Sequence, residues 1–179
     1  PFGGQFCTDR EDPNPMKTPI PVALAALAAA AMLFSGCSVI NQLTGGETRD
    51  DDGSIVEGGD TDVFSIKVGD CIATSTGDAE VTEVPTVPCT EPHEAEVYYD
   101  FEIDAAEYPG EDEIYAQADQ GCYDQFAPFV GLSYEESTLD WSYYYPTEGS
   151  WNQQGDRLIS CLIFDPAGMS TGSLAGVAR

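Results

Sequence analysis

Four cysteines constrain this chain more than any other feature, because their pairing would cross-link segments that are far apart in the sequence. They are Cys71, Cys89, Cys122 and Cys161. Three pairings are possible, and sequence order favours Cys71–Cys89 and Cys122–Cys161. By loop-closure entropy these links would contribute about 3 and about 4 kcal/mol, comparable to the stability of a whole small domain. A zinc site is the alternative, but the C-x-x-C spacing that marks such sites is absent from the sequence.

An apolar run near the N-terminus indicates export. Residues 17–36 read KTPIPVALAALAAAAMLFSG, which is typical of a signal peptide, here residues 16–36 beginning at Met16. The apolar part, 20–34, is shorter than the roughly 20 residues of a membrane span, so a marginal transmembrane anchor is the less favoured alternative. We interpret the acidic residues 1–15 as an upstream extension. Export favours disulfides over free thiols among the four later cysteines.

The apolar run ends in LFSGC, where the small residues Ser35 and Gly36 precede Cys37. This pattern resembles the lipobox of bacterial lipoproteins. In such proteins the cysteine thiol receives a diacylglyceryl group, and a peptidase cuts the chain before it. The resemblance implies that the mature chain begins at Cys37 and that its lipid holds it in the cell membrane, on the extracellular face.

The chain is strongly acidic, with 6 Lys and Arg against 32 Asp and Glu and a net charge of −26. Nucleic-acid binding depends on cations that neutralise phosphates, so a nucleic-acid partner is excluded. Adsorption to an anionic membrane surface is disfavoured for the same reason. We interpret the acidity as a source of solubility and self-repulsion, with a specific cation-binding role as the alternative.

Composition divides the mature chain into three parts. Residues 37–62 are rich in Gly, Asp, Ser and Thr, which indicates a lipid-anchored flexible tether. Residues 63–166 carry the four paired cysteines and most of the aromatic residues, and we predict that they form one small domain. Residues 167–179 are again small and polar, and we predict a polar tail outside the domain.

The domain is predicted to be α+β, a small antiparallel sheet packed with one main helix and joined by two disulfides. Four segments have the alternating or aromatic-rich character of strands: 64–73, 95–103, 138–146 and 157–164. The segment 80–89 contains Pro85 and Pro88. Because proline cannot donate to a sheet ladder, this segment is predicted to be an edge strand or an extended loop.

The segment 111–131 is the one clear helix of the domain. Its apolar residues recur every fourth position, at Ile114, Ala118, Cys122 and Phe126. Three acidic residues at its start match the positive end of a helix dipole. The spacing predicts a helix that faces the core and buries Cys122.

His93 is the only histidine of the chain. It is a candidate general base or ligand, but we favour a hydrogen-bonding role at the strand that follows Pro92. A Cys–His pair would need a free cysteine, and no nucleophile elbow accompanies a Ser–His–Asp triad. Acidic residues are too numerous for any pair of glycosidase-type carboxylates to be singled out. The sequence therefore predicts no catalytic residue, no metal and no cofactor.

Aromatic residues are concentrated in the second half of the domain. All 9 Tyr lie between Tyr98 and Tyr145, with Trp141 and Trp151 nearby. Half-buried faces of a small sheet are the favoured interpretation, because aromatic residues suit a pleated and partly buried surface. Stacking platforms for sugars or peptides are the alternative.

Several short motifs follow one another in a fixed order. They are VGDC (68–71), VPCTEPHEAEVY (87–98), YPG (108–110), Cys122 with FVG (129–131), and then Pro146, Trp151, GDR (155–157) and Cys161. Together they resemble the "septum formation" domain of actinobacterial envelope proteins, over essentially the whole folded part. The resemblance implies an extracytoplasmic domain associated with septation and cell division. It implies no catalytic residue and no particular ligand.

We therefore expect a non-catalytic binding module whose partner is an envelope protein or a wall component. A cell-wall hydrolase that uses His93 and carboxylates is the alternative. The candidate binding residues are His93, Trp151, Asp156 and Arg157, which would form one mixed patch on the acidic surface if they met in space. The structural alternative, which we favour, is that Asp156 and Arg157 pair while Trp151 packs over the join.

Overall fold

The computed structural model describes residues 46–75 and 80–179. Residues 1–45 lie outside this range, and with them the predicted signal peptide, Cys37 and the first part of the predicted tether. All described residues belong to one compact unit. Within the described ranges, no helix is both long and apolar enough to cross a bilayer.

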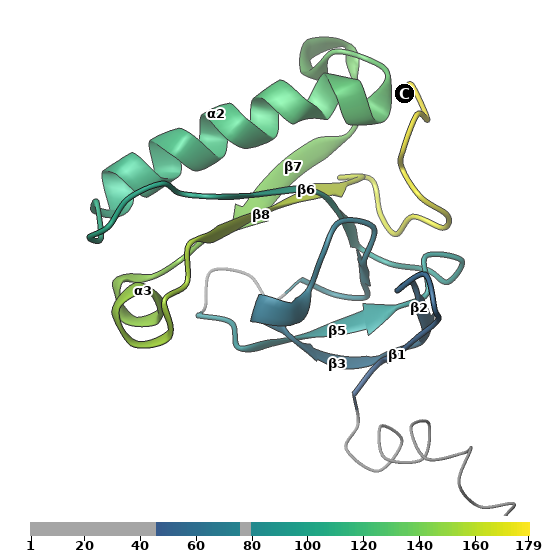
Figure 1. Cartoon of the computed structure of the whole chain (residues 1–179). Helices are drawn as coiled ribbons and strands as arrows, with labels where there is room; N and C mark the ends of the chain where they lie inside the picture. The colour runs from purple at the N-terminus through teal and green to yellow at the C-terminus, as the bar shows by residue number, and fades with distance from the viewer. Residues whose placement is uncertain (1–45, 76–79) are drawn as a thin grey trace, which may run out of the picture. The chain divides into compact units, whose positions relative to one another are not determined.

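An antiparallel sheet of six strands in the order β3–β5–β4–β6–β8–β7 forms the centre of the domain (Figure 1). Its strands are β3 (Gly59–Asp62), β4 (Cys71–Ile72), β5 (Glu83–Val87), β6 (Ala95–Glu102), β7 (Asp140–Tyr144) and β8 (Leu158–Phe164). A separate hairpin pairs β1 (Thr48–Arg49) with β2 (Ile55–Glu57). The helical elements are α2 (Glu111–Val130), α3 (Glu148–Gln154), η1 (Val63–Ser65) and η2 (Tyr134–Glu136). The predicted α+β class with one main helix is confirmed.

The main helix, α2, forms where the spacing predicted it. Every fourth residue is buried along one face, at Ile114, Ala118, Cys122, Phe126 and Val130. Gly131 ends the helix in the left-handed conformation that glycine adopts without strain. Each large apolar side chain buried on this face contributes about 1.5–3 kcal/mol relative to an exposed one. The packing of α2 on the sheet is therefore a major source of stability.

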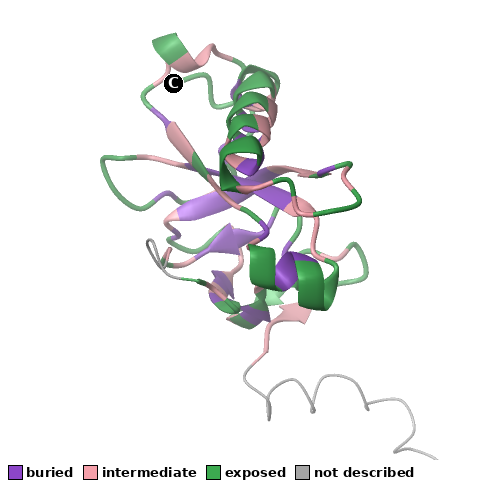
Figure 2. Ribbon diagram, turned by 90° about the vertical axis from the view of Figure 1, so that its left-hand side faces the viewer, coloured by how far each residue is buried: buried purple, intermediate pink, exposed green. Residues whose placement is uncertain are grey.

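Strand β6 contributes to two separate apolar cores because a bulge lies between Val97 and Tyr99. Before the bulge, Val97 packs with Ile72 and Leu162 in a small core. After it, Tyr99 and Phe101 pack against the larger core under α2. Because the bulge adds one residue to the strand, odd-numbered side chains face one side of the sheet before it and the other side after it. Figure 2 shows the buried residues concentrated in the central strands.

Both disulfides join the pairs that sequence order favoured. Cys71–Cys89 connects β4 to the segment after β5, and Cys122–Cys161 connects α2 to β8. Cys122 and Cys161 are fully buried, whereas Cys89 is partly exposed. The two cross-links therefore lie in different surroundings, one inside the large core and one near the surface.

The folded domain begins earlier than composition indicated, because residues 46–62 of the predicted tether are part of it. Strand β3 pairs with β5 along four residues, and Thr61 is buried with its Oγ1 2.7 Å from Thr86 Oγ1. Ile55 of β2 is buried as well. Hydroxyl and backbone hydrogen bonds order this segment without a long apolar run, so its polar composition was misleading.

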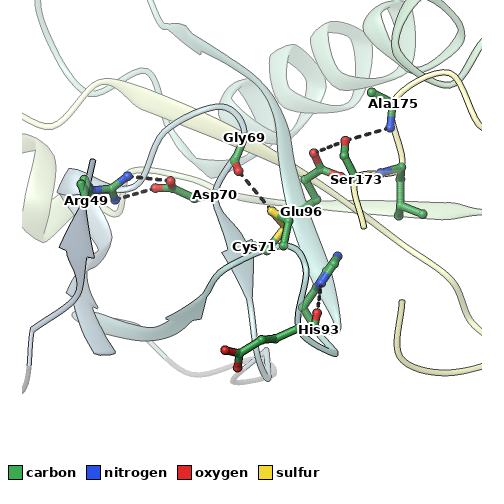
Figure 3. Close-up of a disulfide and its surroundings, with 11 residues drawn as sticks. Arg49, Gly69, Asp70, Cys71, His93, Glu96, Ser173 and Ala175 are labelled. Carbon is green, nitrogen blue, oxygen red and sulfur yellow. Dashed lines mark hydrogen bonds and ion pairs between the residues drawn. A yellow bond between two sulfur atoms is a disulfide. The ribbon is translucent and has the colours of Figure 1, made fainter. Parts of the chain in front are cut away.

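Arg49 fixes the β1–β2 hairpin to the rest of the domain (Figure 3). Its Nη1 and Nη2 donate to the two carboxylate oxygens of Asp70 at 2.7 and 2.8 Å. Asp70 also accepts from the backbone N–H of Lys67 at 3.0 Å. A bidentate pair of this kind is among the stronger polar contacts in proteins. The Asp70 of the VGDC motif therefore anchors the N-terminal segment.

The tail 167–179, expected outside the domain, also packs on it. Ser173 Oγ and the backbone N–H of Leu174 donate to the two oxygens of Glu96, each at 2.7 Å. Leu174 is itself buried, and Ser170 forms a β-bridge with His93. A buried carboxylate needs hydrogen-bond donors, and the tail supplies them. The domain boundary predicted at residue 166 is corrected accordingly.

Two strand predictions are also corrected. Strand β5, which contains Pro85, is not at an edge, because β3 and β4 pair with it on its two sides. The Pro85 carbonyl still takes part, accepting from the Ala73 N–H at 2.8 Å. In the predicted strand 64–73 only Cys71–Ile72 is extended, and η1 and a turn at Gly69 occupy the rest. Gly69 has a φ of +93°, which a strand residue does not adopt.

Candidate functional site

The structure does not bring the four candidate binding residues together. His93 precedes the start of β6, whereas Arg157 precedes Leu158, which pairs with Glu102 at the far end of β6. The Arg157 carbonyl accepts from the N–H of Ile103. A strand rises about 3.3 Å per residue, so the ten residues from His93 to Ile103 span about 30 Å. A single mixed patch of all four residues does not form.

His93 is fully buried under the C-terminal tail. Its Nδ1 lies 2.9 Å from the Glu91 carbonyl oxygen (Figure 3), and its backbone exchanges two hydrogen bonds with Ser170. Among the described residues, no group hydrogen-bonds its Nε2 or Ser170 Oγ, and both atoms are buried. No substrate reaches the imidazole unless the tail moves away. This environment agrees with a hydrogen-bonding role at the start of the strand.

The other three candidates form one cluster between α3 and β8. The Arg157 guanidinium lies 3.6 Å from the ring centroid of Trp151, which is 2% exposed. Asp156 does not form the expected ion pair with Arg157. Its Oδ2 accepts a hydrogen bond from Ser150 Oγ at 2.9 Å, and its Oδ1 accepts one from the Leu158 N–H at 3.0 Å. The cluster connects the end of α3 to the start of β8, and its indole is closed to a partner.

One group of potential metal ligands occurs in the described part of the chain. The ligand atoms of Cys71, Cys89 and Glu96 lie within 4.8 Å of one another. The two sulfurs are bonded to each other, however, and both Glu96 oxygens accept hydrogen bonds from the tail. Zinc binds cysteine as thiolate. With the disulfide formed, Cys71 and Cys89 are a structural cross-link, and the neighbouring Glu96 holds the C-terminal tail.

A groove of about 500 Å³ lies on the face of β7 and β8 that points away from α2. Side chains alternate along a strand, so Ser160 and Leu162 point opposite to Ile159, Cys161 and Ile163 under the helix. The floor consists of Ser142, Leu158, Ser160 and Leu162. One wall comes from α3 and its N-cap, and the other comes from η1 and residues 80–82. Small-molecule sites have volumes of about 300–1,000 Å³.

Two exposed aromatic residues belong to the lining of this groove. Phe64 of η1 is 42% exposed, and Tyr145, which follows β7, is 36% exposed. The Tyr145 ring makes edge-on contacts with Tyr115 and Tyr143, at centroid distances of 5.0 and 5.9 Å. Its hydroxyl lies 3.0 Å from that of Tyr115, and this hydrogen bond raises the pKa of Tyr115 to about 12. The Tyr145 ring therefore packs with residues on the α2 side of the sheet, the side opposite to the groove face.

The groove contains two carboxylates and, among the described residues, no Lys or Arg. Asp156 uses both of its oxygens within the protein, on Ser150 and Leu158. Glu80 is exposed on the opposite wall. Glycoside cleavage needs one carboxyl group as acid and a second as base or nucleophile. Of the two carboxyl groups in the lining, Asp156 is thus already an acceptor in the contact between α3 and β8, and Glu80 is exposed.

Of the residues that line the groove, Asp156 was a candidate binding residue and the tyrosines at 143–145 belong to the candidate stacking segment, but the sequence did not indicate the other lining residues. The lining residues come from η1, β7, α3, β8 and residues 80–82, with Ser75, and the fold alone brings these together. One local signal existed in β8, where Ser160 interrupts the apolar run LISCLIF. Ser160 is only 3% exposed. A polar residue at a buried strand position marks a place where something other than apolar packing is required.

The curled sheet, its covering helix and the two disulfides define the class of protein, a small cross-linked α+β domain. Residues 33–161 match the family model described as septum formation. Because the match covers more than half of the chain, this chain belongs to the septum formation family, and its role is related to cell division. No curated protein and no solved structure shows a significant match.

Proposed function

We propose that this chain is an extracytoplasmic lipoprotein, anchored at Cys37, whose domain acts in septum formation as a non-catalytic binding module. Family membership supports the link to cell division. The LFSGC sequence supports the anchor. Two disulfides in a small domain suit the oxidising space outside the cytoplasm.

The groove on β7 and β8 is the observation that carries the binding role. Its volume is about 500 Å³, and Phe64, one of its lining residues, is 42% exposed. The groups that most often perform catalysis are engaged elsewhere: the four domain cysteines in disulfides, and His93 beneath the tail. A partly apolar groove of this size supports a role in recognition.

The anchor is tested by replacing Cys37 with Ser in the full-length chain. The native protein should carry a lipid mass and sediment with membranes, whereas Cys37→Ser should lose both properties. Ser38→Ala is the matched control, because Ser38 is next to Cys37 in the mature chain and has no thiol. Mass spectrometry with membrane fractionation measures both effects. Unchanged mass and unchanged membrane retention in Cys37→Ser would refute the anchor.

The binding role is tested by following a fluorescent fusion of the full-length chain in dividing cells. We expect enrichment at the septum, and a loss of enrichment in the Phe64→Ala variant. Tyr123→Ala is the control, because Tyr123 is also 42% exposed and does not line the groove. An even distribution of the native chain during division contradicts the proposal. Release of soluble fragments from purified cell wall by the native chain would support the hydrolase alternative instead.

A further inference from the structure

We infer that the outer edge of strand β7 binds a basic, extended peptide segment of a partner protein as an added antiparallel strand, an inference that rests on the proposed binding function and names its partner class. Three features of the molecule support it: the unpaired side of the β7 backbone, the aromatic rings beside it, and the acidic residues around it.

Strand β7 is an edge of the six-stranded sheet, and among the described strands it pairs only with β8. An edge strand is a template for pairing with another chain, and proteins usually protect it with lysine, proline or a bulge. The residues of β7 read DWSYY, without Lys or Pro, and their register with β8 has no bulge. The outer side of β7 therefore lacks these protective features.

The backbone of β8 determines which groups of β7 face outward. The Ile103 N–H donates to the Arg157 carbonyl at 2.9 Å, so Arg157 directs its backbone toward the β6 side. In an antiparallel ladder, successive residues direct their backbone groups to opposite sides. The pairing along β8 has no skipped residue, so Ser160 and Leu162 direct their backbone groups toward β7.

The open backbone groups of β7 therefore belong to Trp141 and Tyr143. The residues opposite the inward-bonding positions of β8 are Ser142 and Tyr144, and the other two alternate with them. In agreement, the Trp141 N–H donates to Asp140 Oδ1 at 2.9 Å. Among the described residues, no backbone group outside the β7–β8 ladder bonds the Trp141 carbonyl or the Tyr143 N–H and carbonyl. These three groups are available to an added strand.

A row of aromatic rings lies beside this edge. The rings of Trp141 and Tyr143 are on the α2 side, because the residues of β8 opposite them belong to the large core. With Tyr134 and Tyr145 they form the aromatic row, in which neighbouring ring centroids are 5.9–6.3 Å apart. An added antiparallel strand places every second side chain on this side. Lys or Arg at those positions would lie against the aromatic row, because the faces of aromatic rings attract cations.

The surroundings of the β7 edge are acidic. Asp140 begins the strand, η2 before it contains two glutamates, and α3 after it begins with Glu148. Arg179 contacts Asp165, the residue after β8, and is paired with it. The whole chain has 6 basic against 32 acidic residues. A basic segment is attracted by this field, whereas an acidic segment is repelled.

A second copy of this chain is the competing occupant of an open edge. Each copy has a net charge of −26, so two copies repel each other. The β7 strand of a second copy would also bring no Lys or Arg to the aromatic row. A basic segment of a different protein complements both the charge and the rings, and a second copy complements neither.

The β7 edge also borders the groove, since Ser142 and Tyr144 belong to the groove lining. The side chains of an added strand that do not face the aromatic row point toward this other side of the sheet. A bound segment would therefore contact the aromatic row with one set of side chains and lie along the rim of the groove with the other.

The test uses the full-length lipidated chain in an uncharged detergent. The probe is a capped peptide of alternating Lys and Thr, with a peptide of alternating Glu and Thr as the acidic comparison. Binding is measured by calorimetry. The Lys–Thr peptide should bind and the Glu–Thr peptide should not. Failure of the Lys–Thr peptide, or equal binding of the Glu–Thr peptide, overturns the inference.

Backbone N-methylation of the probe separates strand addition from simple charge attraction. Residues directly opposite each other share a face in an antiparallel pair, so the Lys residues that face the aromatic row are those whose N–H groups bond β7. Methylation of the Lys nitrogens should weaken the affinity at least about tenfold, a loss of about 1.4 kcal/mol. Methylation of the Thr nitrogens keeps the same charge and should change the affinity little. Equal affinities or the reverse ranking overturn the inference.

Variants locate the binding at β7. Tyr143→Ala removes a ring of the aromatic row, whereas Tyr143→Pro also removes the outward N–H, a change that edge strands tolerate. The proline variant should bind about tenfold more weakly than the alanine variant. Thermal denaturation checks that both variants are folded, and the methylated peptides decide the question if Tyr143→Pro is not.

Asp60→Pro is the matched control at the opposite edge of the sheet. The Val63 N–H donates to the Thr82 carbonyl, so by alternation Asp60 of β3 directs its N–H outward. Strand β3 reads GDTD and has no aromatic ring. Asp60→Pro should leave the affinity unchanged. A loss in Asp60→Pro with none in Tyr143→Pro would place the peptide on β3 and overturn the inference.

The failure of this inference can be distinguished from failure of the proposed function. If the native chain is enriched at the septum while no Lys–Thr peptide binds, the septal role stands and only the strand-addition inference fails. If the peptides bind with the expected ranking but the native chain is not enriched at the septum, the inference holds and the proposed septal role fails.

Discussion

Two regions of the domain reach their stability by different means. The helix-covered region, α2 with β7 and β8, buries a large apolar core that contains both sulfurs of Cys122–Cys161. The N-terminal strand region, β1 to β5, has a smaller core and is held by polar anchors, chiefly Arg49–Asp70 and Thr61–Thr86. Apolar burial tolerates imperfect geometry, whereas a buried polar contact is stabilising only if its partners are in place. The N-terminal strand region should therefore be more sensitive to single polar substitutions.

The largest expected effects come from removing the disulfides. Replacing Cys122 and Cys161 with Ala should lower the free energy of unfolding by about 4 kcal/mol, and replacing Cys71 and Cys89 by about 3 kcal/mol, because the second loop is shorter. The sequence separations are 39 and 18 residues. Denaturant unfolding of the two double variants measures both values. A larger loss at Cys71–Cys89 would reverse the comparison.

The polar anchor of the N-terminal strand region is tested by Asp70→Asn. The amide cannot accept both guanidinium bonds, and Asp70 is only 2% exposed, so we expect a loss of about 2 kcal/mol. Asp165→Asn is the matched control, since Asp165 pairs with the exposed Arg179 at the same 2.7 Å. Exposed pairs contribute about 0–1 kcal/mol. Equal losses in chemical unfolding would show that burial of the pair is unimportant.

The helix-covered region is tested by Gly121→Ala. A Cβ at this position would lie 2.5 Å from the Phe101 ring, so the ring must move. Overpacking costs about 1–3 kcal/mol, and replacing glycine in a helix returns about 1 kcal/mol. We expect a net loss of about 1 kcal/mol in thermal unfolding. The Gly121→Ala, Phe101→Leu double variant should recover part of it, and a stabilised single variant would contradict tight packing at this position.

The smallest expected effect is a pH dependence in the helix-covered region. Burial and a hydrogen bond with Asp119 raise the pKa of Tyr143 to about 12, from an ordinary value of 10.0. Between pH 10 and 12 the Tyr143 hydroxyl is therefore protonated in the folded state and deprotonated in the unfolded state. The contribution of Tyr143 to stability is complete below pH 10 and is lost as pH rises toward 12. Tyr143→Phe should reduce the dependence of the free energy of unfolding on pH between pH 10 and 12. An unchanged dependence would show that other tyrosines cause it.

The difference between the two regions also explains what the sequence could reveal. The helix at 111–130 and the strands near 95–103, 138–146 and 157–164 have long apolar patterns that a single segment displays by itself. Strand β3 reads GDTD, and it is extended only because β5 pairs with it and Thr86 bonds Thr61. That information lies in the partner segment, so the composition of 46–62 indicated a tether.

The same reasoning applies to the candidate site. His93, Trp151, Asp156 and Arg157 stand out in the sequence because they are rare or clustered, but the structure uses them to fix the tail and to join α3 to β8. Helix α3 itself was not predicted, because its capping box has Ser150 where glutamate is usual. The groove combines ordinary serines and exposed rings from distant segments, and only the tertiary structure places them side by side.

The Arg49–Asp70 pair has a mechanical consequence in a chain held by its N-terminus, as proposed. A pulling force on the N-terminal side would be applied at residue 46. Three residues later it would act on the hydrogen bonds that the Arg49 guanidinium donates to Asp70. Asp70 is bonded in sequence to Cys71, so the force passes directly into the Cys71–Cys89 cross-link and from there into the central strands. Strain between the envelope and the domain would therefore act first on this non-covalent pair, and through it on the cross-link.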